Sequence, residues 1–204
     1  MRQARKSALQ ALALDSENPQ AQYVLAQTSH WAGDVGAAIA HASRAIELNA
    51  NFALGHFYLG IGLSLDGRHE DALEAIETGL RLSPRDPRAS TWLANKARAL
   101  YHLRRYEEAI ETALAARRIQ PHAYGFLVLV ASYTQLGRDE EATSALAEIH
   151  TLPGGSAKTM RWYLDRYSDP VAREHMAEGL RARRAFPSND RRAVPDTRTP
   201  ERQL

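Results

Sequence analysis

The chain has 204 residues, of which 44% are hydrophobic and 25% are charged, and its formal net charge is only +2. This balance is typical of a globular protein with a core, and the longest nearly uninterrupted apolar run, residues 124–133, is about half of the roughly 20 residues that cross a bilayer. The absence of cysteine excludes a disulfide framework and a thiolate metal site, so we expect a cytoplasmic protein with no membrane association.

Residues 1–16 predict an amphipathic helix. Basic residues precede an apolar stretch, as in a signal peptide, but Gln10 interrupts that stretch and Asp15 follows it at once. The apolar spacing of this helix recurs downstream, where it belongs to the second helix of a helical hairpin. We therefore expect residues 1–16 to be a second helix without its partner, with one face left uncovered.

From residue 1 to residue 153 the sequence repeats itself with a period close to 34. The clearest marker is an alanine within a charged amphipathic segment, found at Ala4, Ala38, Ala72, Ala109 and Ala142. A small side chain at this point lets two helices approach to about 8–10 Å. We expect four helical hairpins, at about 19–50, 53–84, 90–121 and 123–153.

The turn inside each hairpin has its own signal. Gly33, Gly67 and Gly137 each follow a predicted first helix, at a point where a left-handed backbone favours glycine. Acidic residues follow in each hairpin, where they complement the dipole of the next helix. Arg104 replaces the glycine in the third hairpin, and we expect that turn to differ.

With this period and these residues, the segment 1–153 resembles the tetratricopeptide repeat family. The resemblance implies an all-α solenoid of antiparallel helix pairs that form a right-handed superhelix. It also implies a scaffold that binds a protein or peptide, with no enzymatic activity of its own. Individual copies depart from the family pattern: Ser29 stands where an aromatic residue is usual, and Lys96-Ala97 stands where Leu-Gly is usual.

A looser resemblance concerns residues outside the repeat packing. The stretch 167–174, which includes Asp169-Pro170, and the stretch 178–181 are similar to the C-terminal tetratricopeptide region of bacterial class III adenylate or guanylate cyclases. This resemblance implies a regulatory or oligomerising arm of a cyclase-like signalling protein. The alternative is a fragment of a larger cyclase whose catalytic domain lies outside this chain. No catalytic residue is carried over.

Two segments follow the repeats. Residues 154–186 predict capping helices, because Met160, Trp162 and Tyr163 give a dense apolar pattern and Asp169-Pro170 is a typical helix start. We expect these helices to pack on the last repeat and to cover its apolar face. Residues 187–204 lack apolar periodicity and predict a disordered tail.

The first helices of successive repeats are expected to line a concave groove, and their exposed positions are the candidate peptide-binding residues. An aromatic groove that also carries an Asn-Arg pair would suit an extended or helical peptide, with Arg98 pairing a carboxylate. The alternative for Tyr23, Phe57 and Leu127 is that they pack between repeats. The candidates are Tyr23, Gln27, His30, Trp31, Phe57, Ile61, Ser64, Asn95, Arg98, Tyr101, His102 and Leu127.

Other motifs give no catalytic, cofactor or metal site. The segment 154–159 lacks the glycine spacing of a phosphate-binding loop, and the eight histidines include no pair four residues apart. Gly60 and Gly62 lie inside a predicted helix, where close helix packing is the better interpretation. The arginines after residue 170 have no interleaved aromatic platform, so we do not expect nucleic-acid binding. The expected partner is a protein or peptide, or a second copy that covers residues 1–16.

Overall fold

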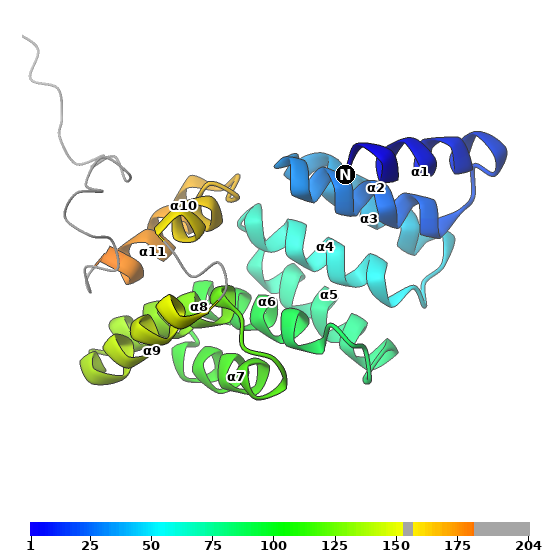
Figure 1. Ribbon diagram of the computed structural model, residues 1–204. Coiled ribbons are helices and arrows are strands. Elements are labelled where there is room, and N and C mark those ends of the chain that lie inside the picture. Colours follow the sequence, from blue (N-terminus) through cyan, green and yellow to red (C-terminus); the bar gives the residue numbers. More distant parts are fainter. Residues whose placement is uncertain (153–156, 182–204) are drawn as a thin grey trace, which may run out of the picture.

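The computed structural model describes residues 1–152 and 157–181, with side chains from residue 160 onward in the second range. Within these ranges it contains eleven α-helices and no strand. Four helix pairs follow a first helix, α1 (Arg2–Leu14). They are α2 (Pro19–Ala32) with α3 (Val35–Leu48), α4 (Ala53–Leu65) with α5 (His69–Leu82), α6 (Ala89–His102) with α7 (Tyr106–Ile119), and α8 (Ala123–Gln135) with α9 (Asp139–Thr151). The prediction of an all-α solenoid of antiparallel helix pairs is confirmed (Figure 1).

The recurring alanines lie where the two helices of each pair meet. Ala38, Ala72, Ala109 and Ala142 are all at most 1% exposed. Ala4, which matches them in sequence, is exposed, and Ala8 is the buried residue of α1. The physical reason is that α1 packs chiefly against α2 in the described part of the chain, so the face that carries Ala4 stays open to solvent.

Each of the four hairpin turns contains one residue with a positive φ. This residue is Gly33 (φ 86°), directly after α2, and Gly67 (84°), Arg104 (60°) and Gly137 (68°), each two positions after the end of its first helix. The expectation of a different turn at Arg104 is therefore wrong. The tertiary packing of α6 against α7 imposes on an arginine a conformation that costs a residue with a side chain roughly 1–2 kcal/mol.

Trp92, on α6, packs where the second and third helix pairs meet, after the longer connection of residues 83–88. Its ring is fully buried and stacks on Phe57, with the ring centroids 4.7 Å apart. A Cβ at Gly79 of α5 would lie 2.7 Å from the Trp92 ring, so glycine makes room for the indole. One large side chain thus joins the second and third helix pairs across the longer connection.

Two further helices, α10 (Ala157–Leu164) and α11 (Pro170–Arg181), follow the repeats. Asp169 accepts a hydrogen bond from the Ala172 amide at 2.7 Å, so α11 begins as predicted. The helix α11 packs against α8, but it also contacts α6. The segment between the helices reaches α4, because the Ser168 amide donates to the Leu65 carbonyl at 3.0 Å.

These helices consequently do more than cover the last repeat. They lie across the open side of the curved stack, between α8 and the C-terminal end of α2 (Figure 1). The predicted tail, residues 187–204, falls outside the described residues. No helix in the described ranges is both long and apolar enough to span a bilayer.

Candidate functional site

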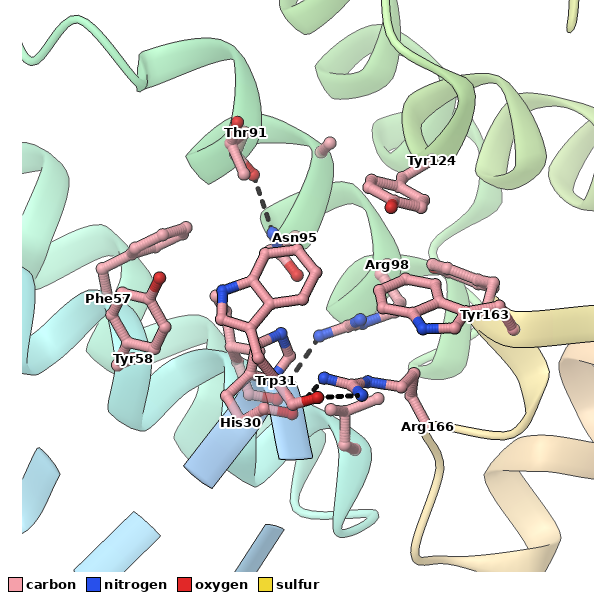
Figure 2. A pocket seen from close by; sticks show the side chains of 14 residues that line it. His30, Trp31, Phe57, Tyr58, Thr91, Asn95, Arg98, Tyr124, Tyr163 and Arg166 are labelled. Carbon is pink, nitrogen blue, oxygen red and sulfur yellow. Dashed lines mark hydrogen bonds between the residues drawn. The ribbon is translucent and has the colours of Figure 1, made fainter. Parts of the chain in front are cut away.

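A pocket of about 100 Å³ lies between the first helices of the repeats and α10 (Figure 2). It brings together half of the twelve predicted groove residues. Those six are His30, Trp31, Phe57, Ile61, Asn95 and Arg98. They come from α2, α4 and α6, so the expectation that successive first helices share one surface agrees with the geometry of this pocket.

The rest of the lining was not predicted from the sequence as part of a site. Three of these residues, Trp162, Tyr163 and Arg166, come from α10 and the turn after it. The others are Tyr58, Leu65, Thr91, Ala94 and Tyr124. The aromatic pattern of residues 160–167 indicated a buried helix, but nothing local in the sequence indicated that this helix faces α2.

Aromatic rings form one wall of the pocket. The rings of Trp31 and Trp162 stack with their centroids 5.7 Å apart, and Trp162 also stacks on Tyr124 at 5.6 Å. Tyr124 in turn stacks on Tyr163 at 5.8 Å. Trp31 is 42% exposed, so its indole stands at the rim of the pocket.

Arg98 is the buried charge of the pocket, with only 5% of its surface exposed. Its Nε donates a hydrogen bond to Ser64 Oγ at 3.1 Å, and its Nη2 donates to the Ile61 carbonyl at 3.3 Å. The guanidinium carbon lies 6.0 Å from the ring centroids of both Tyr163 and Tyr167. These partners hold the guanidinium in place without neutralising its charge.

Arg166 joins the C-terminal segment to the end of α2. Its guanidinium donates to the carbonyls of His30 and Trp31, which belong to the last turn of that helix. A cation at this point complements the negative end of the helix dipole. The same guanidinium lies 4.6 Å from the Trp162 ring centroid and 5.8 Å from that of Trp31.

His30 is uncharged at neutral pH in this setting. Burial lowers its pKa from 6.5 to about 3, with the charges of Arg166 and Arg98 acting in the same direction. Burial and the nearby Arg98 also lower the pKa of Arg166. The two arginines therefore supply the full charges of the pocket, since no aspartate or glutamate is among its lining residues.

Three predicted groove residues support the pocket wall from behind. Gln27 donates hydrogen bonds to the hydroxyls of Tyr58, at 2.9 Å, and Tyr23, at 3.3 Å. Ser64 is fully buried under Arg98. Tyr23 is 7% exposed and packs edge-on against Tyr58. They lie next to the pocket and not at its surface.

The last three predicted residues are buried. Tyr101 donates a hydrogen bond to the His175 carbonyl of α11 at 2.8 Å. His102 lies 2.9 Å from the Tyr167 hydroxyl through its Nε2 atom, and 3.3 Å from His175 Nδ1 through its own Nδ1. Leu127 on α8 is completely buried. For Tyr101 and His102, the covering group is the C-terminal segment of this chain, which occupies that part of the predicted groove.

The other motifs have structural explanations where they can be seen. Gly60 and Gly62 lie at close helix contacts, since a Cβ on each would meet Ile76 at 2.5 Å and Ile39 at 2.6 Å. No group of three or more potential metal ligands occurs among the described residues. Residues 154–159, which we did not expect to form a phosphate-binding loop, are not among the residues whose side chains the structure describes. The pocket itself offers guanidinium groups, an amide and aromatic faces, which are groups suited to recognition.

Comparisons with known proteins agree with this architecture. A family model described as "Tetratricopeptide repeat" matches residues 1–53 and 66–124, which together are more than half of the chain. No curated protein matches the chain.

Solved structures provide the fold comparison. The structure of PilW, described as a widely conserved type IV pilus biogenesis factor, is 18% identical with a TM-score of 0.66, over 92% of this chain and 87% of that one. YrrB, described as a TPR protein with an unusual peptide-binding site, is 16% identical with a TM-score of 0.60, over 93% and 96%. A thermophilic TPR protein of Thermus thermophilus is 20% identical with a TM-score of 0.58, over 86% and 88%. At these identities the likeness concerns the fold alone.

Proposed function

The chain belongs to the tetratricopeptide repeat family, and from that premise we propose that it is a non-enzymatic scaffold that binds a segment of a partner protein at the pocket between the repeats and α10. The observation that carries the proposal is the meeting of six predicted groove residues around one aromatic pocket. YrrB, whose structure has a similar fold, is described as having a peptide-binding site, which adds support to a peptide as the ligand.

Within this proposal the predicted residues take different parts. Trp31, His30, Asn95 and Arg98 contact the ligand, because each lines the pocket. Phe57 and Ile61 form its apolar floor. The remaining candidates, Tyr23, Gln27, Ser64, Tyr101, His102 and Leu127, position these groups from behind or lie under the C-terminal helices.

Selection of peptides from a random display library tests the proposal. We expect the intact chain to enrich peptides that no longer bind when Trp31 and Asn95 are both changed to alanine. The matched control is Ile119→Ala, because Ile119 is also an exposed apolar residue, at 56%, but lies at the end of α7 away from the pocket. Equal binding by the two variants, or no enrichment at all, contradicts the proposal.

Self-association is a second candidate, favoured by α1. Leu9 and Leu14 of this helix are 49% and 91% exposed, while Ala8 packs on α2. A second copy that covers this face would bury both leucines. Light scattering should then show a dimer that the double variant Leu9→Glu, Leu14→Glu converts to a monomer; a wild-type monomer at high concentration contradicts the idea.

The link to cyclase-like signalling proteins and the cytoplasmic location stay predictions. Their support is the sequence of residues 167–174 and 178–181, and the lack of cysteine. An in-frame cyclase domain in the genomic sequence upstream of Met1 would favour the fragment alternative over an independent scaffold.

A further inference from the structure

The pocket contains two positive charges without a negative partner in the described part of the chain. Arg98 is 95% buried, and its described partners are the Ser64 hydroxyl, the Ile61 carbonyl, the faces of two tyrosine rings and a side-chain hydrogen bond with Tyr163, none of which carries a negative charge. Nε and Nη2 donate to Ser64 and Ile61, so no carboxylate is among the described hydrogen-bond partners of Arg98. Burial of an unneutralised guanidinium costs several kcal/mol, so its neighbourhood favours an anion.

Arg166 places the second charge beside the first. It also pairs with no described carboxylate, since its hydrogen bonds go to the His30 and Trp31 carbonyls. The mutual repulsion of the two guanidiniums contributes to the lowered pKa of Arg166. His30 is uncharged between them and adds no further positive charge. Figure 2 shows both arginine side chains directed into the pocket next to His30 and Trp31.

We propose that this pocket binds the side-chain carboxylate of an aspartate or glutamate in the partner segment, held between Arg98 and Arg166. The inference rests on the proposed scaffold function and adds the chemistry of its ligand. A carboxylate would pair with the guanidinium of Arg98 and relieve the repulsion between the two guanidiniums. The apolar stem of the acidic side chain would lie against Trp31, Phe57 and Ile61.

The lining favours a carboxylate over a phosphate. A phosphate ester carries close to two charges and three acceptor oxygens, which need several donors. Here most of the wall consists of aromatic and aliphatic side chains, and Arg166 already donates to two carbonyls. A volume of about 100 Å³ admits one small anionic head with its stem. A single negative charge on an apolar stem therefore matches the donors that remain.

A titration with small probes tests the chemistry without a known partner. Propionate reproduces the glutamate side chain, propionamide is its neutral counterpart, and methyl phosphate is the competing anion. We expect saturable NMR shifts of the Trp31 and Trp162 indole N–H signals with propionate at constant ionic strength. Equal shifts with propionamide or with chloride, or shifts that do not saturate, overturn the inference. Tighter binding of methyl phosphate than of propionate also overturns it, because the pocket would then select a phosphate.

Arginine variants test whether propionate binds between Arg98 and Arg166. Arg98→Met and Arg166→Met should each weaken propionate binding about 10- to 100-fold, the loss typical of a charged hydrogen bond. The matched control is Arg117→Met, because Arg117 pairs with Glu148 on the outer helices and does not line the pocket. Circular dichroism checks that each variant is folded. Arg166 is partly exposed and bonds only to carbonyls of a helix end, so its variant remains informative if Arg98→Met unfolds.

Peptides from the display selection separate this inference from the proposed function. Enrichment of an acidic residue, lost on Asp→Asn or Glu→Gln exchange in the peptide and in the Arg98→Met protein, supports both. Enriched peptides that need no acidic residue leave the scaffold function standing and overturn the carboxylate. Propionate binding at the pocket without any peptide enrichment supports the anion site and contradicts the scaffold function.

Discussion

Gly60 lets α4 and α5 pack closely, because it has no Cβ. A Cβ built there would lie 2.5 Å from Ile76 Cγ1 and 2.9 Å from the Ala72 carbonyl oxygen on α5. The side chain of Ile76 could rotate away, but the backbone oxygen cannot move without shifting α5. The close approach of α4 to α5 therefore depends on glycine at this position.

Gly60→Ala should lower the free energy of unfolding by about 1–3 kcal/mol, the usual range for overpacking. The matched control is Gly36→Ala in α3, because Gly36 is exposed and its nearest neighbour is the Asp34 side chain at 4.0 Å. That exchange should raise stability by some tenths to about 1 kcal/mol through helix propensity. Urea unfolding measures the free energy of unfolding of both variants. If Gly60→Ala is more stable than the wild type, α5 can shift to accommodate the methyl group and the prediction is wrong.

Arg98 is a residue whose charge opposes folding. Changing it to methionine keeps much of the length of the side chain, removes an unneutralised buried cation and should raise stability by about 1–2 kcal/mol. The hydrogen bonds that are lost go to two side-chain hydroxyls, on Ser64 and Tyr163, and to the Ile61 carbonyl. Thermal and urea unfolding provide the measurement. A loss of more than about 1 kcal/mol would mean that these bonds and the two tyrosine faces outweigh desolvation.

Among the elements, α11 decides how much of the concave side is open. A Cβ at its Gly179 would lie 2.6 Å from the Tyr101 hydroxyl, 2.8 Å from Ala131 Cβ and 3.0 Å from Ala131 Cα. The helix thus sits directly on α6 and α8. Tyr101 and His102 are buried next to this contact, whereas Trp31 at the rim of the pocket is 42% exposed.

Gly179→Val should displace α11 while leaving the repeats folded, because the added methyl groups meet the backbone of α8. Hydrogen exchange should speed up by at least about tenfold in α11 but not in α3, which lies at the other end of the repeats. Val171→Ala is the control, since Val171 lies in the same helix and is 75% exposed. Unchanged protection of α11 in the glycine variant would show that this helix can shift without detaching.

Across the whole molecule, buried histidines make stability depend on pH. Burial lowers the pKa of His30 to about 3 and that of His69 to about 4, and it lowers the pKa of His102 well below 6.5. The pKa of His175 is also lowered, chiefly by burial. His102 and His175 face each other through their Nδ1 atoms, so both cannot donate there. The three neighbouring histidines His69, His102 and His175 also lie near charged side chains. These are Arg98, Arg104, Asp169, Glu70 and Glu178.

The sign of the pH effect follows from these lowered values. The unfolded chain binds protons near pH 6.5, while the folded chain does so only near the lowered values, so stability is fully present above pH 6.5 and falls as pH decreases. Each strongly shifted histidine should remove about 1–2 kcal/mol by pH 5. Carboxylates with a lowered pKa, such as Asp86, lose their contribution only below about pH 4.

Urea unfolding at pH 7.5 and pH 5.0 measures this difference. His102→Asn should flatten the profile, because the most deeply buried titrating ring is gone. A free energy of unfolding that is unchanged or greater at pH 5.0 would contradict the prediction.

The amino-acid sequence by itself determined the repeat. Helix periodicity, the alanine at each crossing and the glycine after each first helix act within one hairpin, over about 34 residues, so they could be identified without a structure. The same local logic placed His30, Trp31, Asn95 and Arg98 on one surface, because consecutive repeats stack in a fixed way. It also predicted the start of α11 at Asp169.

Only the tertiary structure decided what faces that surface. Arg166 bonds to His30 and Trp31 across more than 130 residues of sequence, and no periodic pattern indicates such a contact. Several apolar surfaces could have received the aromatic face of residues 160–167, and the choice among them depends on shape and charge at the end of α2. For the same reason the sequence expected Tyr101 and His102 in an open groove, whereas the fold buries them under α11 and builds the pocket beside them.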